Sequence, residues 1–433
     1  METEQLVKYI ENLGADSFVI RKLESKIEQI RYSNNEVDLR NYWLQESLSI
    51  FLSKGKKTSE LNLDSDKNLE DKIETAYRKM LLGEDSSSFH GINDRKYPSI
   101  NKKMSVKDSP DLNEIVNECI RGAKDGGAER VTGLAYHYET VDRIVTPYNS
   151  HEVTYDSLNF EVRAFNGVNT GQEGIHCGPE SVNLTKSAYE AGIEAGKTSS
   201  INVPDLSFEE GNYNTILSPY VIGNIFSYCD SLFSAYSVRS GMSYLESNIG
   251  NKIASSELTI TDEPLNTTGS NYCLFDDEGT PAMNNTIIDR GTLKTFLHSF
   301  STAKEYGVKT TANAGIISPV ALQLSMSAGS KSLNDIIGET KNGLYIKNAW
   351  YTRFQDNRNA VFSTVPRDGI FVIRNGDIAG RIKSVRISDS FGKIINSITE
   401  TSKERKNVKF WEEVKPSIMP NAKILDLRVT KAF

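Results

Sequence analysis

Three consecutive carboxylates are the clearest candidates for chemistry in this chain. Asp276, Asp277 and Glu278 stand before Gly279 and, two residues later, Pro281. Hard oxygen ligands of this kind could hold Mg²⁺ or Ca²⁺, but a calcium loop requires further oxygen ligands at regular offsets. Glycine tolerates positive φ and proline ends ladder pairing, which is typical of a turn. We therefore predict a solvated turn rather than a metal site.

The histidines and cysteines do not form a complete metal site by their spacing. His151-Glu152 begins an HExxxD string that ends at Asp156, but the β-branched residues within it favour a strand over a helix. A zinc site needs three protein ligands, and no third ligand is indicated here. His176 and Cys177 are adjacent, so on a strand they point to opposite faces. We predict that His151 lies in a turn before a strand and that His176 and Cys177 have structural roles.

A short segment of small and polar residues follows the carboxylates. Residues 310–315 read Thr-Thr-Ala-Asn-Ala-Gly. Such a loop permits close approach of a backbone, which could belong to a neighbouring strand or to a peptide. Both interpretations stay open. In the second one, Thr311, Asn313 and Gly315 line a substrate groove together with the carboxylate turn.

Local signals around these residues predict the elements that position them. Strands are expected around Ile287-Ile288 and over Leu293–Leu297, joined by a loop that contains Gly291. Ser299 stands where an N-cap begins a helix, and Gly307 stands where a glycine ends one. The carboxylates and the small loop are thus expected to flank a hairpin and a short helix.

The remaining pattern predicts an α+β protein in three regions. These are an N-terminal α+β domain (1–105), a central α+β region (106–211) and a strand-rich C-terminal domain (212–433), mostly antiparallel or barrel-like. The first region shows three or four short strand candidates: 17–22, 27–33, 36–42 and 47–52. Residues 83–110 read as a linker. Helices are expected over 3–13, 69–82, 112–123, 184–196 and 219–235.

Bulk composition excludes several classes of function. The chain has 433 residues, of which 38% are hydrophobic and 25% charged, with a formal charge of −7. The chain lacks the surplus of basic residues that would indicate nucleic-acid binding, and its apolar runs are too short to span a bilayer. The acidic N-terminus does not resemble a signal peptide, and the four cysteines form no CxxC. We expect a cytoplasmic protein whose partners are neither nucleic acid nor membrane.

Further motifs extend the pattern towards the C-terminus. They are Gly343-Leu344-Tyr345-Ile346, then Phe362-Ser363, then the stretch Arg367–Ile378 with Asn375-Gly376-Asp377 near its end. In order and spacing, these segments and residues 275–315 resemble the C-terminal half of the TldD/PmbA family. The resemblance implies a two-subunit metallopeptidase, with a strand-rich domain at this end of the chain.

The resemblance also distinguishes two kinds of subunit. The metal-binding kind carries HExxxH on a helix early in this half, and a cysteine much nearer the C-terminus completes its zinc site. Here the corresponding helix contains no histidine, and Ser227, Tyr228 and Leu232 occupy the motif positions. The last cysteine is Cys273. The resemblance therefore implies a TldE/PmbA-like subunit with no catalytic residue and no cofactor of its own, and zinc in the partner.

Three functional hypotheses follow. In the first, a TldD-like HExxxH subunit pairs with this chain in a heterodimer or larger complex and acts on unfolded peptides. In the second, the chain is a stand-alone homodimeric peptide-binding protein without catalysis. In the third, it is a metallopeptidase with unrecognised ligands. Metal content separates the third hypothesis from the other two.

We expect the isolated chain to bind no stoichiometric zinc, because a zinc site needs three protein ligands and the motif positions supply none. Elemental analysis after dialysis against a weak chelator measures this, with an HExxxH-bearing relative as the control that retains its zinc. One zinc per chain, lost when a histidine and a cysteine are replaced together, would contradict the expectation.

Overall fold

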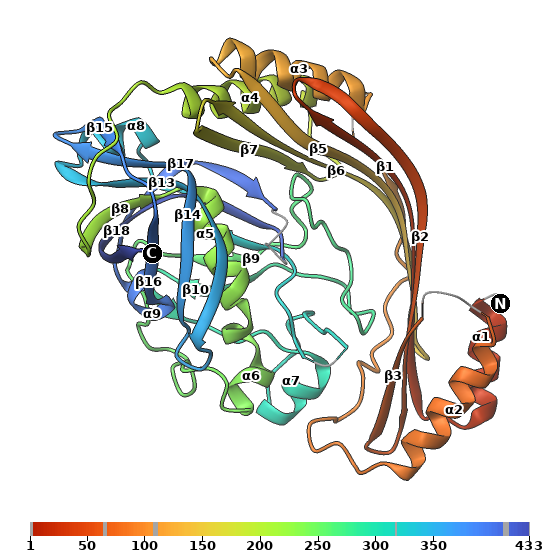
Figure 1. Ribbon diagram of the computed structural model, residues 1–433. Helices are drawn as coiled ribbons and strands as arrows, with labels where there is room; N and C mark the ends of the chain where they lie inside the picture. Colours follow the sequence, from red (N-terminus) through yellow and green to blue (C-terminus); the bar gives the residue numbers. More distant parts are fainter. Residues whose placement is uncertain (1–2, 64–66, 107–110, 317, 410–414, 433) are drawn as a thin grey trace.

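Two β-sheets organise the protein. The computed structural model describes residues 3–63, 67–106, 111–316, 318–409 and 415–432. The N-terminal half forms a long curved sheet, and the strand-rich C-terminal half lies against its concave face (Figure 1). Helices and strands do not alternate regularly along the chain. This arrangement confirms the predicted α+β class.

The curved sheet is mostly antiparallel. Its strands are β1 (Ser17–Ser33), β2 (Glu36–Lys54), β3 (Lys57–Leu63), β4 (Asn101–Met104), β5 (Arg130–Val145), β6 (Ser150–Asn166) and β7 (Asn169–Cys177). Their order is β3-β2-β1-β5-β6-β4, and β7 also pairs with β6. β4 pairs in parallel with β6. Strands from 1–105 and from 106–211 share this one sheet, and the division between those two regions stays a prediction.

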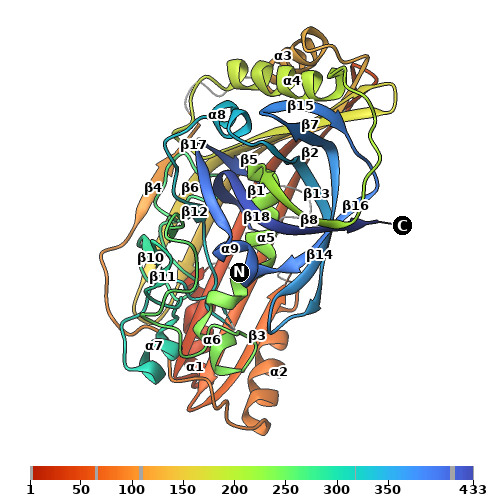
Figure 2. The same ribbon diagram turned by 90° about the vertical axis from the view of Figure 1, so that its left-hand side faces the viewer.

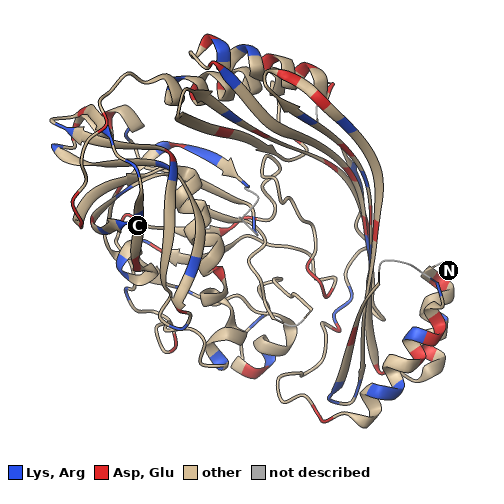
Figure 3. Cartoon of the chain, viewed as in Figure 1, with Lys and Arg blue, Asp and Glu red and all other residues tan. Residues whose placement is uncertain are grey.

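Two helix pairs cover the two ends of the convex face. They are α1 (Thr3–Leu13) with α2 (Leu69–Leu82), and α3 (Leu112–Asp125) with α4 (Leu184–Ser200). Alternate residues of β1 explain this, because Ile20 packs in the α1–α2 core and Ile30 in the α3–α4 core. Charges of both signs are interspersed along these helices (Figure 3). Within the described ranges, no helix is long and apolar enough to cross a membrane.

The C-terminal half contains a small closed ring of strands. The strands of this half are β8 (Gly211–Leu217), β9 (Ile260–Asp262), β10 (Asn285–Asp289), β11 (Thr292–Leu293), β12 (Leu324–Met326), β13 (Asn342–Asp356), β14 (Val361–Arg374), β15 (Asp377–Arg381), β16 (Val385–Ser390), β17 (Ile398–Val408) and β18 (Ser417–Lys431). Five of them, β8, β13, β14, β16 and β18, form the ring. β8 pairs with both β13 and β18, while β14 and β16 link these two strands on the other side. This closure fits the barrel-like expectation.

Short helices pack around and inside this half. They are α5 (Pro219–Cys229), the 3₁₀ helix η1 (Asp230–Phe233), α6 (Ala235–Arg239), α7 (Phe300–Tyr306), α8 (Leu333–Gly338) and α9 (Phe391–Asn396). α5 packs on β13 and β18, and its residues belong to the largest apolar core (Figure 2). Capping chemistry sets its start, because the Ser218 hydroxyl accepts from Val221 N and Pro219 takes the first turn.

Several predicted element boundaries are wrong. The four short strands of residues 17–52 are two long ones, β1 and β2, because their polar middles stay in the antiparallel ladder. The linker contains β4, and His151 lies within β6 rather than in a turn. The helix from Pro219 ends at Cys229, since Ser234 is extended and bridges to Leu297. Of the strand predicted over Leu293–Leu297, only Leu293 lies in a strand, as the last residue of β11.

Buried ion pairs join the curved sheet to the C-terminal half. Glu173 of β7 is 2% exposed and receives the ammonium groups of Lys347, at 3.0 Å, and Lys406, at 2.7 Å. Nearby, Arg163 of β6 pairs with Asp368 at 2.7 Å. Because two cations surround Glu173, they hold its pKa down to about 2 even though burial acts in the opposite direction. These contacts hold β6 and β7 against β13, β14 and β17.

Replacing Gly133 with alanine should destabilise the curved sheet. A Cβ at this position of β5 would lie 2.0 Å from the carbonyl oxygen of Glu161 and 2.2 Å from the hydroxyl of buried Tyr32. We expect a loss of about 1–3 kcal/mol, typical of overpacking. Chemical denaturation measures it. The control is Gly338→Ala, where a Cβ meets no atom within 4 Å; equal stability of the two variants would contradict the packing argument.

Candidate functional site

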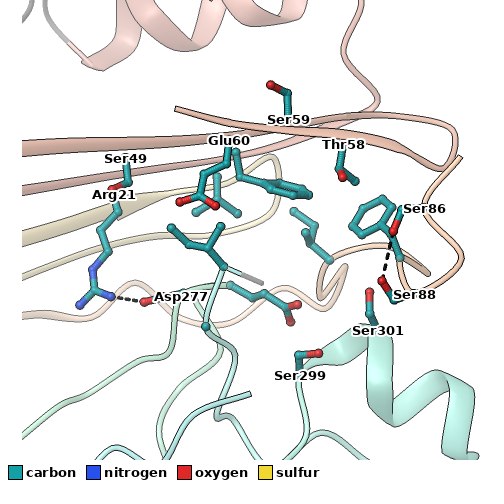
Figure 4. A pocket seen from close by; sticks show the side chains of 17 residues that line it. Arg21, Ser49, Thr58, Ser59, Glu60, Ser86, Ser88, Asp277, Ser299 and Ser301 are labelled. Carbon is teal, nitrogen blue, oxygen red and sulfur yellow. Dashed lines mark hydrogen bonds and ion pairs between the residues drawn. The ribbon is translucent and has the colours of Figure 1, made fainter. Parts of the chain in front are cut away.

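A cavity of about 300 Å³ lies where the curved sheet meets the C-terminal half. Its walls come from β1, β2 and β3, from residues 86–92, from the carboxylate turn and from the start of α7 (Figure 4). Hydroxyl groups dominate the polar lining: Ser49, Thr58, Ser59, Ser86, Ser88, Ser299 and Ser301. Phe51, Phe89 and Ile92 supply apolar wall. A cavity of this size and mixed lining is typical of a binding site for an organic ligand.

The predicted turn forms one wall, and it is buried rather than solvated. Asp276 is 1% exposed, and its carboxylate accepts backbone N–H groups from Glu278, Thr280 and Ala314. Gly279 has φ of 72°, which fits the predicted glycine position. The turn prediction is therefore confirmed, but the solvation prediction is wrong. Glu278 is buried as well, while Asp277 keeps 24% of its side chain exposed.

Side chains of the curved sheet hold this turn in place. Arg21 of β1 pairs with Asp142 at 2.7 Å and also with Asp277, towards which it points in Figure 4. His151 accepts from Ile100 N through Nδ1, so its Nε2 donates to the Gly279 carbonyl at 3.0 Å. Burial lowers the pKa of His151, which keeps the ring neutral in this role. His151, the first residue of the HExxxD string, thus makes a structural contact.

Glu278 is a candidate proton carrier in the cavity. It is 8% exposed, and one carboxyl oxygen accepts from Phe300 N at 3.1 Å. Burial, and next the charge of Asp276, raise the pKa of Glu278 well above its usual range. Burial also raises the pKa of Asp276, against the effect of its backbone donors. Because Asp276 receives three N–H groups, we assign the negative charge to Asp276 and the proton to Glu278.

The small loop is packed mainly for structure. The Asn313 amide donates to Asp262 at 2.5 Å and to Val320 O at 2.9 Å, and Asn313 is 0% exposed. Thr311 Oγ1 accepts from His298 N at 2.7 Å. Ala312 between them is buried too, and Gly315 alone of the three predicted groove residues borders the cavity. These contacts favour the neighbouring-strand interpretation for most of the loop.

The positions aligned with the metal motif lie apart from the cavity lining. Ser227 Oγ accepts from Lys415 N at 3.1 Å, and the Lys415 ammonium pairs with Asp230. The Tyr228 hydroxyl accepts from Arg353 at 3.0 Å. Leu232 is 2% exposed and belongs to the C-terminal core. These groups are committed to contacts within the chain.

Sequence patterns missed most of the cavity. Arg21 and Ser49 alternate with apolar residues in strands, where charged and polar side chains are usually solvated. Phe89 lies in the stretch that reads as a linker. Beyond the predicted Asp277, Glu278 and Gly315, a sequence signal exists for Ser299, because a capping residue fixes the start of α7 beside the carboxylate turn. The other walls follow from tertiary contacts alone.

Glu278→Gln should raise the melting temperature at pH 8 and change it little at pH 5. The folded pKa of Glu278 lies above the ordinary value of 4.5, so its contribution to stability is lost as the pH rises above about 4.5. Glutamine keeps the acceptor for Phe300 N without a charge. Thermal unfolding at both pH values measures this. Glu257→Gln, which changes an exposed carboxylate, is the control and should leave the melting temperature unchanged at both pH values. A lower melting temperature for Glu278→Gln at pH 8 would show that Glu278 is ionised.

Comparisons with known proteins agree with the fold and with the family motifs in residues 275–378. Residues 210–431 match the PmbA/TldA metallopeptidase C-terminal domain. The metalloprotease TldD homolog of Buchnera aphidicola is 30% identical over 168 residues, which make up 37% of this chain and 34% of that protein. The matched stretch therefore spans about a third of that relative's length.

Solved structures match over almost the entire chain. TldE from Thermococcus kodakarensis has a TM-score of 0.79 and 20% identity, with 99% of both chains covered. A Thermotoga maritima protein, described as a candidate modulator of a DNA gyrase, has a TM-score of 0.80 and 19% identity with 99% of both chains covered. At these identities the likeness shows a shared fold. Since the family match extends over half of the sequence, the chain belongs to the TldD/PmbA metallopeptidase family.

Proposed function

We propose that this chain is a TldE-like subunit of a TldD–TldE-type metallopeptidase complex and binds no metal itself. The observation that carries the proposal is what lies around the aligned motif positions. The hydroxyl of Ser227 accepts from the backbone of Lys415, whose ammonium pairs with Asp230. Asp230 is 7% exposed, so this pair is largely shielded from water. The ammonium group of Lys415 thus lies beside the positions that align with the metal motif.

Zinc does not fit these residues. Zn²⁺ takes imidazole, thiolate and carboxylate ligands, whereas Leu232 has no donor atom and Ser227 and Tyr228 are already engaged. The nearby ammonium of Lys415 would repel a divalent cation in a partly buried site. Across the part of the chain that the structure describes, no three His, Cys, Asp or Glu side chains gather as a metal site. We therefore assign no metal-dependent step to this chain.

The cavity supports a role in holding an unfolded peptide. Its serine and threonine hydroxyls can donate to peptide carbonyls and accept from peptide N–H groups. Its apolar wall around Phe51 and Phe89 can accept side chains of varied shape. A protonated Glu278 adds a donor for a carbonyl without adding charge. These features suit an extended chain of varied sequence, which is the substrate class we propose.

In this proposal, the HExxxH partner carries out the hydrolysis. Its zinc would polarise the peptide carbonyl and its glutamate would activate the water. This chain would complete the chamber and position the substrate. The two roles are separable by experiment, because metal and catalytic base reside in one subunit and the cavity in the other.

Reconstitution tests the proposal. The purified chain is mixed with an HExxxH-bearing relative encoded in the same genome, and cleavage of a reduced, alkylated protein is followed. We expect the two chains to associate, the mixture to cleave faster than either chain alone, and zinc to remain with the relative. Changing the motif glutamate of the relative to glutamine should abolish cleavage.

A variant of this chain tests the cavity itself. Thr58→Trp fills part of the cavity and should slow cleavage by the mixture several-fold, while association and melting temperature stay near normal. Val168→Trp is the matched control at a site 84% exposed. Zinc-dependent cleavage by the chain alone would favour an independent metallopeptidase. Full activity of the relative without association would show that the subunit role is wrong.

A further inference from the structure

The charged groups that line the cavity do not balance one another. Among the described lining residues, Arg21 is the only lysine or arginine. The acids of the lining are Glu60, Asp277 and Glu278. Arg21 is already engaged twice, because it donates to Asp142 at 3.1 Å through Nε and at 2.7 Å through Nη2, and its Nη1 pairs with Asp277. One cation therefore serves two carboxylates before any further acid is counted.

Glu60 is the acid that has no cation beside it. It lies on β3 directly opposite Phe51 of β2, and its carboxylate stands on the cavity side of these strands (Figure 4). One carboxyl oxygen accepts from the Asn62 amide at 2.7 Å. Within the ranges that the structure describes, no lysine, arginine or histidine forms an ion pair with Glu60. Glu60 thus adds a carboxylate that the chain leaves without a counter-charge.

Asp277 lies within the electric field of Glu60. Burial raises the pKa of Asp277, and the Arg21 guanidinium acts in the opposite direction. The charges of Asp142 and Glu60 raise this pKa further. Arg21 occupies Oδ1 of Asp277, whereas Oδ2 has no hydrogen-bond partner in the described part of the chain. A cation between Glu60 and Asp277 would relieve their repulsion and use the vacant oxygen atoms.

The rest of the lining suits an organic cation. Ser49, Thr58 and Ser59 lie on the same strands and offer hydroxyl oxygens as further acceptors. A primary ammonium has three N–H donors and no acceptor, so two carboxylates and one hydroxyl satisfy it. The rings of Phe51 and Phe89, with centroids 5.5 Å apart, offer apolar surface to a carbon chain and aromatic faces to a cation.

A metal ion fits this lining less well. Ca²⁺ takes about six to eight oxygen ligands, and Mg²⁺ demands near-ideal octahedral geometry. Among the described residues, no three His, Cys, Asp or Glu side chains gather as a metal site. The aromatic wall would give a bare ion no ligand, whereas it can contact the carbon atoms of an organic one. The lining therefore favours an ammonium group that is attached to a larger molecule.

We propose that the cavity binds a primary ammonium group of the peptide, held between Glu60 and Asp277. The group is the free α-amino end of the peptide or a lysine side chain, which share this chemistry. The inference rests on the substrate-holding role proposed above and adds a preference for one chemical group. Glu278, which carries a proton by our assignment, can donate to a peptide carbonyl beside the ammonium.

Binding of matched peptides to the purified chain tests the preference. Three short peptides of alanine and serine carry the same C-terminal fluorophore. The first has a free α-amino group, the second is N-acetylated, and the third is N-acetylated with one internal lysine. Fluorescence anisotropy at one fixed low salt concentration gives each Kd. We expect the first or the third peptide to bind about tenfold more tightly than the second, because each bond to a charged group contributes to affinity. The tighter one identifies the source of the ammonium.

Variants of Glu60 assign the preference to the cavity. Glu60→Gln should remove most of the tenfold preference and leave the Kd of the acetylated peptide unchanged. Glu60→Lys should abolish the preference, because the chain then supplies an ammonium of its own. The matched control is Glu36→Gln, which removes the same charge at an exposed position of β2 and should bind like the wild type. Melting temperatures confirm that each variant is folded.

The outcomes separate this inference from the subunit role. Equal binding of the three peptides, or no binding, would overturn the inference, as would a preference that survives in Glu60→Lys. Binding of Ca²⁺ alone that is lost in Glu60→Gln would assign the carboxylates to a metal and overturn it too. Association with the HExxxH relative is measured separately. If that association fails while the ammonium preference persists, the subunit role is wrong and the cavity still selects an ammonium.

Discussion

The burial of charge between the two halves is the constraint on which the rest of the structure depends. Carboxylates that lose water need a compensating partner or a proton, since uncompensated buried charge is strongly unfavourable. At the turn, Asp276 takes three backbone donors, Asp277 takes Arg21, and Glu278 takes a proton by our assignment. His151 closes the contact at Gly279. The cavity exists because these partners hold the two halves at this distance.

A second buried cluster secures the other end of the curved sheet. Glu173 lies between Lys347 and Lys406, so β7 is held to strands that come much later in the chain. Removing one partner of such a cluster would leave an uncompensated buried charge, which is strongly unfavourable. The curved sheet is thus attached at two separated places along its concave face. The cavity lies at one of them, and its walls come from both halves.

The polar groups near the aligned metal motif differ from those of the cavity. Ser227, Asp230 and Lys415 engage one another, and Leu232 belongs to the apolar core. The cavity instead presents hydroxyls and a carboxylic acid to an open volume. This contrast underlies the assignment of a substrate-holding role rather than a metal-dependent one. In the proposed complex, the chemistry and the holding surface are divided between two chains of one family.

Local chemistry in the sequence determined the fold class, the start of α5, both ends of α7 and the carboxylate turn, because caps and turns depend on neighbouring residues. The sequence also carried the family block of residues 275–378. Only the tertiary structure decided that β1 and β2 are long strands, that Asp276 is buried and that a cavity lies beside it. Arg21 and Asp277 are 256 positions apart. Contacts at that separation follow from how the sheet curves around the C-terminal half, and no local pattern in one sequence encodes them.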